Sequence, residues 1–268
     1  MATYVFSDVH GHFGTLDRLL ERVSPTSDDR IFMLGDMIDR GPDPISVVRC
    51  CYQLPNTTVL MGNHEDLMLS YYSDPDDTMA RVNWLINGGE TTQEGLRSLP
   101  VDERIELARW LFTLPLYAQA EVGGRRYLLV HAGIDPRRIP SKDVAEWDEI
   151  AIDEVVADQY RDDLMWIRED FWSVPTGLVN EKGEGPIVIA GHTPTLYLEH
   201  MADLPDRPAK NARGLCQMVR VGACEQTGGV ADRWDIDCGC AGGAGFGQLL
   251  MLRLDDGEEI YEPVREGE

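Results

Sequence analysis

The chain has 268 residues, of which 43% are hydrophobic, and a formal net charge of −23 at pH 7. This apolar fraction is sufficient for a large buried core and excludes a disordered chain. The acidic surplus disfavours nucleic acid as a partner, because phosphate backbones are bound by basic surfaces. No stretch approaches the roughly 18 consecutive apolar residues that a membrane span requires.

The first residues predict a strand that begins near residue 3, and they do not show the pattern of a secretory leader. We therefore expect a cytoplasmic protein with reduced thiols, built as one domain over residues 1–268. Cys216, Cys224, Cys238 and Cys240 lack the paired Cys-x-x-Cys spacing of a zinc site. Burial as small apolar side chains is the favoured interpretation of these cysteines.

The first third of the chain alternates short apolar runs with segments of helical periodicity. The alternating strands and helices are predicted at 4–6, 13–23, 31–34, 45–54, 58–61 and 65–72. A polar motif follows each strand at once: Asp-Val-His-Gly at 8–11, Gly-Asp-Met-Ile-Asp-Arg-Gly at 35–41 and Gly-Asn-His-Glu at 62–65. Ligands of open α/β sheets bind at the carboxyl ends of the strands, so the three motifs are predicted to converge.

The middle of the chain is predicted to be helical and the last part to be rich in strands. Helices are expected over 77–99 and 101–114, followed by a hairpin over 117–130 around Gly123-Gly124. An acidic helical or loop region over 134–171 precedes a strand at 187–190. A surface loop over 200–215 is followed by strands at 217–221, 234–237 and 248–254. Two of these strands deliver further histidines, in His131-Ala132-Gly133 and Gly191-His192-Thr193.

The motifs supply donors for two metal ions, namely Asp8, His10, Asp36, Asn63, His131 and His192. Oxygen and imidazole nitrogen suit Mn, Fe and Zn, and Mn is the expected metal with Fe or Zn as alternatives. Two ions about 3.5–4 Å apart form a clamp for in-line displacement at phosphorus. Asp36 is the natural bridging carboxylate. Two dications against two aspartates leave a positive site that would attract phosphate and acidify a bound water.

Other polar residues of the motifs suggest roles outside the metal shell. A protonated His64 would donate a proton to the leaving oxygen, and Asp39 would orient His64 and favour its charged form. Arg40 and Arg168 offer planar guanidinium groups that match phosphate oxygens.

In these motifs the chain resembles the phosphoprotein phosphatases, the bimetallic serine/threonine phosphatases, in their bacterial branch. The family's motifs are matched in order from Ser7 to Thr193, and residues 235–240 resemble its final strand. Ser7 departs from the usual glycine, at a position not used for ligation. The resemblance implies an α/β (α+β) metallophosphoesterase fold, a central β-sandwich flanked by helices.

The resemblance also implies a role for each site residue. The first metal would take Asp8, His10 and Asp36, the second would take Asp36, Asn63, His131 and His192, His64 would be the general acid with Asp39, and Arg40 and Arg168 would bind phosphate. The implied reaction is hydrolysis of phosphomonoesters, with phosphoserine and phosphothreonine of proteins as expected substrates, by in-line attack of a metal-bridging hydroxide. The expected partner is thus a phosphorylated protein or a small phosphoester, without nucleic acid or membrane.

Three other functions compete with this interpretation. Diadenosine tetraphosphatases are similar in fold and metal site, but they typically lack an acidic residue at the Asp39 position. Nucleases of this fold end in Gly-His-x-His, whereas Thr193-Pro194 follows His192 here. A non-catalytic binding module would have lost a ligand or His64, and neither is lost.

Several residues are interpreted more plainly. His12 and His200 lie outside the motifs and are predicted to be surface histidines, and Trp84, Trp110 and Trp166 are predicted to be packing residues. Glu65 is assigned to the first turn of a helix, where negative charge is favourable. Residues 87–90 fit a substrate-side loop or a turn that ends a helix.

Overall fold

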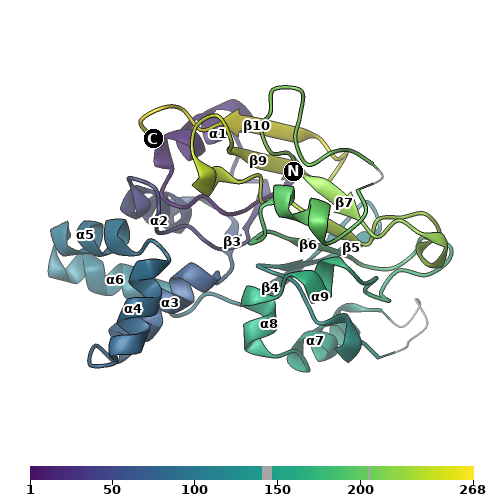
Figure 1. The fold of residues 1–268 in the computed structure, drawn as a ribbon, viewed down its shortest axis with the longest axis horizontal. Coiled ribbons are helices and arrows are strands. Elements are labelled where there is room, and N and C mark those ends of the chain that lie inside the picture. Colours follow the sequence, from purple (N-terminus) through teal and green to yellow (C-terminus); the bar gives the residue numbers. More distant parts are fainter. Residues whose placement is uncertain (141–146, 205) are drawn as a thin grey trace.

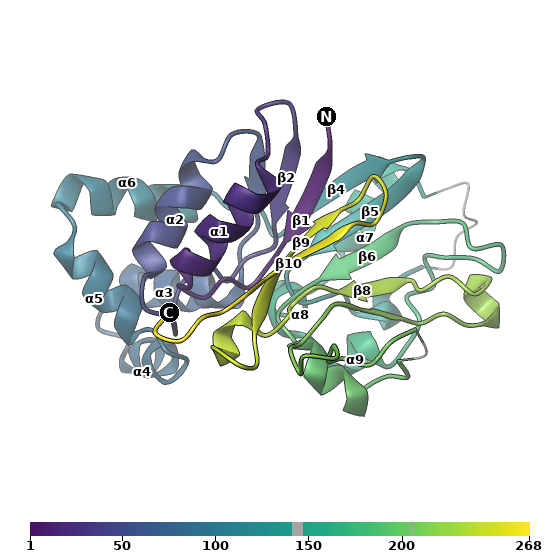
Figure 2. The same ribbon diagram turned by 90° about the horizontal axis from the view of Figure 1, so that it is seen from above.

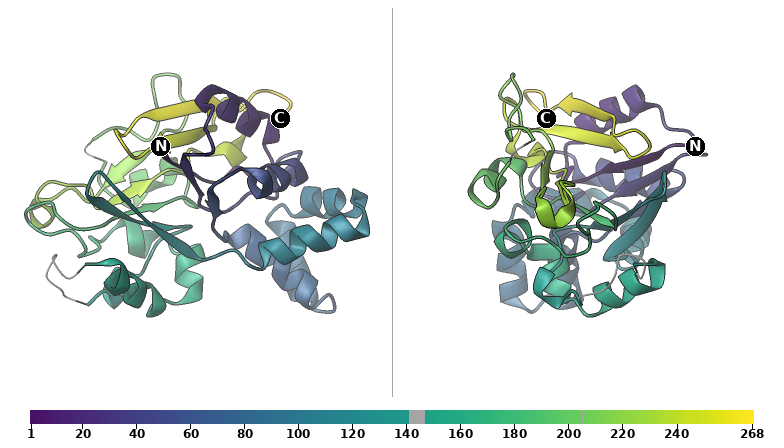
Figure 3. Two further views of the ribbon diagram at one scale, coloured as in Figure 1. Left: turned by 180° about the vertical axis from the view of Figure 1, so that it is seen from behind. Right: turned by 90° about the vertical axis from the view of Figure 1, so that its right-hand side faces the viewer.

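The computed structural model describes residues 1–140, 147–204 and 206–268, and parts of the predicted 134–171 region and 200–215 loop lie outside them. Two five-stranded sheets face each other with helices on their outer sides (Figures 1, 2 and 3). The first sheet has the order β10 (Glu259–Pro263), β9 (Gln248–Arg253), β1 (Thr3–Phe6), β2 (Arg30–Met33), β3 (Thr57–Val59). The second has the order β4 (Tyr117–Val122), β5 (Arg125–Val130), β6 (Ile187–Ala190), β8 (Arg233–Asp235), β7 (Val219–Val221).

Helices fall into two groups. The first contains α1 (Phe13–Val23), α2 (Pro44–Gln53), α3 (Asn63–Ser73), α4 (Thr78–Ile86), α5 (Glu90–Ser98) and α6 (Val101–Leu111). The second contains α7 (Glu149–Ala157), α8 (Arg161–Trp166) and α9 (Glu169–Trp172). Helices α3 to α6 cluster at one end of the sandwich (Figures 1 and 3). No helix in the described part of the chain is both long and apolar enough to cross a membrane.

Alternation along the strands explains the layers, because successive side chains of a strand point to opposite faces. In β1, Val5 belongs to the apolar core between the sheets, while Phe6 packs with Leu16 and Leu19 of α1. In β6, Ile189 faces the inter-sheet core and Val188 packs with the α7 to α9 side. Both faces of these strands are buried, which is why they read as continuous apolar runs.

The direction of the strands brings the polar motifs together. Strands β1, β2 and β3 are parallel in the first sheet, and β5, β6 and β8 are parallel in the second. The carboxyl ends of parallel strands lie at one edge of a sheet, and the residues that follow these ends form the candidate site.

The predicted sandwich flanked by helices is confirmed, with three differences in detail. Strand β10 was not predicted, because its sequence Glu-Ile-Tyr-Glu-Pro carries charges on an edge strand. Helix α3 begins at Asn63, two residues before the predicted start. The predicted helix over 77–99 is two helices, interrupted at residues 87–89 by a turn in which Gly88 has φ 101°.

Candidate metal centre and active site

Five strand ends deliver the predicted site residues to one buried place. The segments that follow β1, β2, β3, β5 and β6 carry these residues, all of them buried, with Asn63 and His64 in the first turn of α3: Asp8, His10, Asp36, Asp39, Asn63, His64, His131 and His192. Arg40 is exposed and Arg168 is half-buried at the start of α9. The convergence predicted from the three N-terminal motifs therefore extends to the loops of the second sheet.

The backbone of this site is strained. Of the eight described non-glycine residues with positive φ, six are predicted site residues: Asp8, His10, Asp36, Asp39, Arg40 and His192. Each residue in this left-handed region costs free energy, on the order of 1–3 kcal/mol, and persists only where its surroundings hold it. The concentration of such residues in one place supports the prediction that this is the functional site.

Glu65 holds the loop after β2 in this conformation. Its carboxylate accepts hydrogen bonds from the backbone amides of Asp36 at 2.8 Å, Met37 at 2.9 Å, Ile38 at 3.3 Å and Gly62 at 3.0 Å. Burial and the neighbouring Asp36 carboxylate raise the pKa of Glu65 to about 7. The interpretation from sequence placed Glu65 in the first helical turn but did not foresee that it clamps the Asp36 loop.

Asp36 lies between two groups of potential ligands. Its Oδ2 is 3.4 Å from Nε2 of His10, and its Oδ1 is 3.5 Å from Nε2 of His131. Two sets of donor atoms close enough to share an ion contain Asp36, namely His10 with His64 on one side and His131 with His192 on the other. This placement supports the proposed bridging role of Asp36.

The histidine tautomers fit a cation. Nδ1 of His131 donates to the carbonyl oxygen of Leu34 at 2.7 Å, and Nδ1 of His10 donates to that of Ile38 at 3.0 Å. In the neutral rings Nε2 then carries the lone pair. Burial lowers the pKa of His10, His131 and His192, which keeps them neutral.

Asn63 completes this donor set. Its Oδ1 lies 2.8 Å from Nε2 of His131 and 2.9 Å from Nδ1 of His192. The lone pairs of His131 Nε2 and Asn63 Oδ1 repel at this distance unless a cation lies between them. The residues present therefore fit a divalent metal ion on the His131 side of Asp36.

Asp8 is buried among other acidic side chains, Asp36 and Asp237. Its carboxylate accepts the backbone amide of His192 at 3.1 Å and the hydroxyl of Ser7. It lies outside the two compact donor sets, and the set that contains His10 and Asp36 has His64 as its third member. Burial and Asp237, which follows β8, raise the pKa of Asp8 well above its ordinary value. Ser7, the one departure from the family motif, thus contacts a predicted ligand directly.

His64 and Asp39 form a buried pair beside this centre. Nδ1 of His64 donates to Oδ2 of Asp39 at 2.8 Å. Burial opposes a charge on His64, but the carboxylates of Asp36 and Asp39 outweigh it and raise its pKa. Arg40 Nη2 lies 2.9 Å from Nε2 of His64, a contact that only the neutral ring can accept. An anion that drew Arg40 away would free Nε2 to carry the proton.

Two arginines supply positive charge at the site. Arg40 Nη1 lies 3.3 Å from Nε2 of His10, so a cationic group already sits near the first donor set. Burial comes first among the causes that lower the pKa of His192, and the charge of Arg168 is a further one. Among the described residues no carboxylate forms an ion pair with Arg40 or Arg168. Burial raises the pKa of Asp237 to about 6, and the charges of Arg40 and Arg168 oppose this rise, so both arginines already act on a buried carboxyl group of the site.

Three plain interpretations of single residues need correction or refinement. His12 is buried, with 4% of its surface exposed, so the prediction of a surface residue was wrong, while His200 is exposed as predicted. Trp84 is buried as predicted, but its indole also bonds to Asp39. Trp166 remains 38% exposed, with its ring centroid 5.8 Å from that of His192.

The cysteines contribute no ligand to these donor sets. Cys216, Cys238 and Cys240 are buried as predicted, but Cys224 is only half-buried, so the prediction was wrong for that residue; all six thiols are free. Among the described residues, the groups of side chains close enough to share an ion contain no cysteine.

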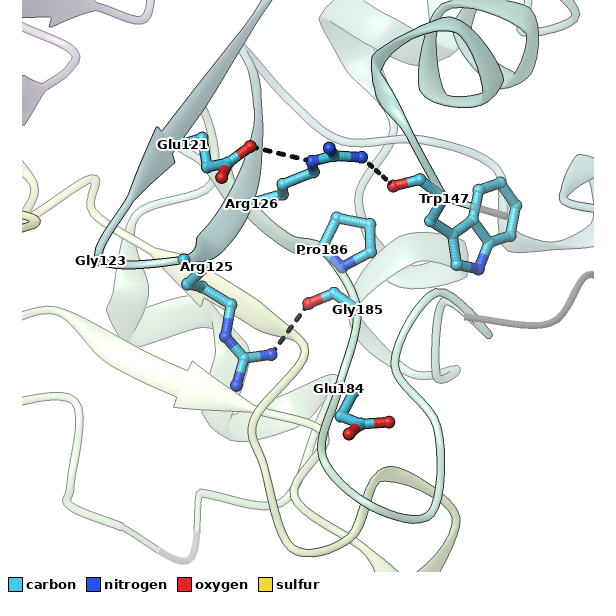
Figure 4. Close-up of a pocket in the computed structure, with 9 residues that line it drawn as sticks. Glu121, Gly123, Arg125, Arg126, Trp147, Glu184, Gly185 and Pro186 are labelled. Atoms are coloured by element: carbon cyan, nitrogen blue, oxygen red, sulfur yellow. Dashed lines mark hydrogen bonds and ion pairs between the residues drawn. The ribbon is translucent and has the colours of Figure 1, made fainter. Parts of the chain in front are cut away.

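A separate surface cavity lies at the other end of the second sheet (Figure 4). It is lined by the β4–β5 turn and by residues 184–186, which precede β6, whereas His131 and His192 follow the opposite ends of these strands. Arg125 donates to the carbonyl oxygens of Gly183 at 2.8 Å and Gly185 at 2.9 Å, and Arg126 bonds to Glu121 and the Trp147 carbonyl. These arginines fix loops and are separate from the site.

The sequence is similar to those of curated bacterial proteins. The chain is 31% identical over 144 residues to a symmetrical bis(5'-nucleosyl)-tetraphosphatase of Cellvibrio japonicus, covering 51% of this chain and 46% of that protein. It is also 31% identical over 169 residues to the enzyme of the same name from Pseudomonas fluorescens, covering 61% of this chain and 55% of that protein. The chain thus spans about half the length of these curated relatives.

The fold is shared with solved structures. A metallophosphoesterase from Sphaerobacter thermophilus superposes with a TM-score of 0.53 at 16% identity, over 99% of this chain and 88% of that one. A family model described as calcineurin-like phosphoesterase matches residues 1–218, a range that contains Asp8, Asp36, His64, His131 and His192. With a match over most of its length and through all of these motif residues, the chain belongs to the calcineurin-like phosphoesterase family.

Proposed function

We propose that the chain is a metal-dependent hydrolase of dinucleoside tetraphosphates. A phosphoester substrate is supported by the position of Asp36 between two donor sets, with the positive charges of Arg40 and Arg168 close to their histidines. The choice of a dinucleotide is supported by the names of the relatives, which are tetraphosphatases and not serine/threonine phosphatases. The exposed indole of Trp166 beside His192 offers a surface on which a nucleobase can stack.

The site residues would have distinct roles in phosphoester hydrolysis. Divalent ions, which the family implies, would be held by Asp8, His10 and Asp36 and by Asp36, Asn63, His131 and His192. When bound, they polarise the phosphoryl group and lower the pKa of a bound water. Arg40 and Arg168 bind the phosphoryl oxygens and hold the phosphorus in line with the leaving oxygen. His64 donates its proton to that oxygen from Nε2, and Asp39 stabilises the charged ring.

A second candidate is hydrolysis of phosphoserine or phosphothreonine, and the Asp39–His64 pair favours it. A serine or threonine alkoxide is a strong base that must be protonated as it leaves. A nucleoside phosphate is a much weaker base and leaves with less help. Proton donation by His64 is therefore more important for hydrolysis of a serine or threonine phosphomonoester than for hydrolysis of a dinucleotide.

A direct comparison of the two substrates tests the proposal. Purified protein with added Mn is offered diadenosine tetraphosphate and a phosphothreonine peptide in parallel, with chelator and Asp36→Asn as controls. Metal-dependent cleavage of the dinucleotide at the higher kcat/KM supports the proposal. Preference for the peptide would transfer the assignment to protein phosphatase, and activity on neither, with metals bound, would contradict both.

Replacement of Arg168 is expected to weaken catalysis without loss of metal. Arg168→Ala removes a charged donor to phosphate, which is worth about 10- to 100-fold in kcat/KM. Arg161→Ala is the matched control, because Arg161 belongs to the preceding helix α8 and is ion-paired with Asp66 at 2.6 Å. An unchanged kcat/KM in Arg168→Ala, or an equal loss in the control, would remove Arg168 from the site.

A further inference from the structure

The carboxylate of Asp39 is enclosed by donors that come from helices α4 and α5. The indole Nε1 of Trp84 lies 3.1 Å from Oδ1 and 3.0 Å from Oδ2. The hydroxyl of Thr92 donates to Oδ1 at 2.6 Å. With Nδ1 of His64 at 2.8 Å from Oδ2, both oxygens are bonded and all four side chains are buried. The carboxylate has no freedom to rotate while these contacts persist.

Thr92 also holds the backbone of Asp39. Its hydroxyl oxygen accepts the amide of Asp39 at 2.9 Å while the hydroxyl donates to the Asp39 carboxylate. This two-sided contact fixes a residue whose φ is 69°, a conformation that non-glycine residues rarely adopt unaided. One threonine thus sets both the position of the residue and the direction of its side chain.

Trp84 is held in turn by its own surroundings. Tyr71 stacks on the indole, with ring centroids 5.5 Å apart and planes inclined by 30°. Gly89 leaves room for the ring, because a Cβ atom there would lie 2.5 Å from Nε1. The same turn contacts the next site residue, since the amide of Arg40 donates to the carbonyl of Gly88 at 3.0 Å. The turn at 87–89 therefore connects helices α4 and α5 to the active site through contacts with Trp84 and Arg40.

We propose that Trp84 and Thr92 are positioning residues that hold the Asp39–His64 pair in the geometry needed to protonate the leaving group. The proposal rests on the proposed phosphoesterase function, in which His64 is the acid, but not on which phosphoester is the substrate. The side-chain hydrogen bonds of both residues run to Asp39, which is not among the proposed metal ligands. They act through Asp39, because a carboxylate that can turn away no longer aligns the imidazole.

A purely structural role would give a different kinetic signature. If Trp84 and Thr92 served only to attach α4 and α5, their loss would disturb the whole site and slow every ester alike. A role in positioning the acid affects only reactions that need a proton on the leaving oxygen. The dependence of rate on leaving group separates the two explanations.

The experiment compares phenyl phosphate, a poor leaving group, with 2,4-dinitrophenyl phosphate, a good one, on metal-loaded protein. Thr92→Val keeps the shape of the side chain but removes the hydroxyl, and Thr92→Ser restores it. Trp84→Phe removes the indole N–H. We expect Thr92→Val and Trp84→Phe to lower kcat for phenyl phosphate about tenfold and for the dinitrophenyl ester less than about threefold. Thr92→Ser should stay within about threefold of the parent on both.

A second variant and a second measurement protect the test against misfolding. Gly89→Ala displaces the indole while leaving its chemistry intact, and it should repeat the pattern of Trp84→Phe. The proton on Nδ1 of His64, followed by NMR in histidine-labelled protein without metal, should give a downfield signal in the parent and in Thr92→Ser. That signal should weaken or broaden in Thr92→Val, because the hydrogen bond to Asp39 is no longer fixed.

Measuring His64→Asn on the same two esters distinguishes failure of the positioning role from failure of the acid role of His64. Equal losses on both esters, or no loss with an unchanged NMR signal, would overturn the positioning role while His64→Asn still discriminates between the esters. If His64→Asn itself fails to discriminate, the assignment of His64 as the acid fails, and the positioning role falls with it.

Discussion

Asp36→Asn is expected to abolish metal binding and phosphoesterase activity together. Asp36 is the one residue common to both donor sets, and its two oxygens face different histidines, His10 and His131. The amide keeps the shape of the side chain but replaces one anionic oxygen with a hydrogen-bond donor that cannot ligate. Without bound metal the phosphoryl group loses several kcal/mol of charge stabilisation, so we expect activity to fall at least about 1,000-fold.

The measurement is metal content per chain, by elemental analysis after dialysis, together with kcat on the preferred substrate. Asp43→Asn is a suitable control, because Asp43 caps α2 from the same loop and asparagine preserves a cap. This control should retain both metals and full activity. Activity in Asp36→Asn within about tenfold of the parent would contradict the bridging role.

The sequence was sufficient to predict which side chains converge, because most of the candidate site residues lie at strand ends. Asp8, Asp36 and Asn63 each follow a short apolar run, and parallel strands bring such ends to one edge. The residues that the sequence did not reveal act through contacts distant along the chain. Nothing near Trp84 or Thr92 distinguishes them from helical packing residues, and their partner Asp39 lies 45 and 53 positions away.

Burial gives a second reason for the missed assignments. Glu65 reads as an ordinary first-turn glutamate, yet it is fully buried and bonds to amides of a loop 27 to 29 residues earlier. His12 was predicted to be a surface residue because it lies outside the motifs, yet its ring is buried close to Gly41 and Glu268. Local propensity carries no information about either, because the tertiary arrangement decides which polar groups become enclosed.

Asp39 alone was not a sufficient basis for predicting the substrate. An acidic residue there favoured a phosphatase over a tetraphosphatase, whereas the curated relatives are named tetraphosphatases. The structure shows that Asp39 bonds to His64, Trp84 and Thr92, all within the chain. Asp39 therefore indicates that His64 is held as a general acid. This relates to the basicity of the leaving group and only indirectly to the identity of the substrate.

His64→Asn is expected to retain both metals and to slow hydrolysis in proportion to the basicity of the leaving group. The loss in kcat should be about 100- to 10,000-fold for a phosphothreonine peptide, which needs a proton on its alkoxide. It should be far smaller for nitrophenyl phosphate and for a dinucleotide, whose leaving groups are weaker bases. Asparagine is chosen because it fills much of the space of the ring without titrating.

The metal content of His64→Asn distinguishes between two roles of His64 that are compatible with the geometry, metal ligand and general acid. Its ring nitrogen lies in one donor set with His10 and Asp36, so a ligand role predicts loss of one metal in His64→Asn. An acid role predicts two metals and a steep dependence on leaving group. His200→Asn, at an exposed histidine far along the chain, should change neither quantity. Equal slowing of all esters at full metal content would exclude proton donation, because the chemistry of the leaving oxygen would then not matter.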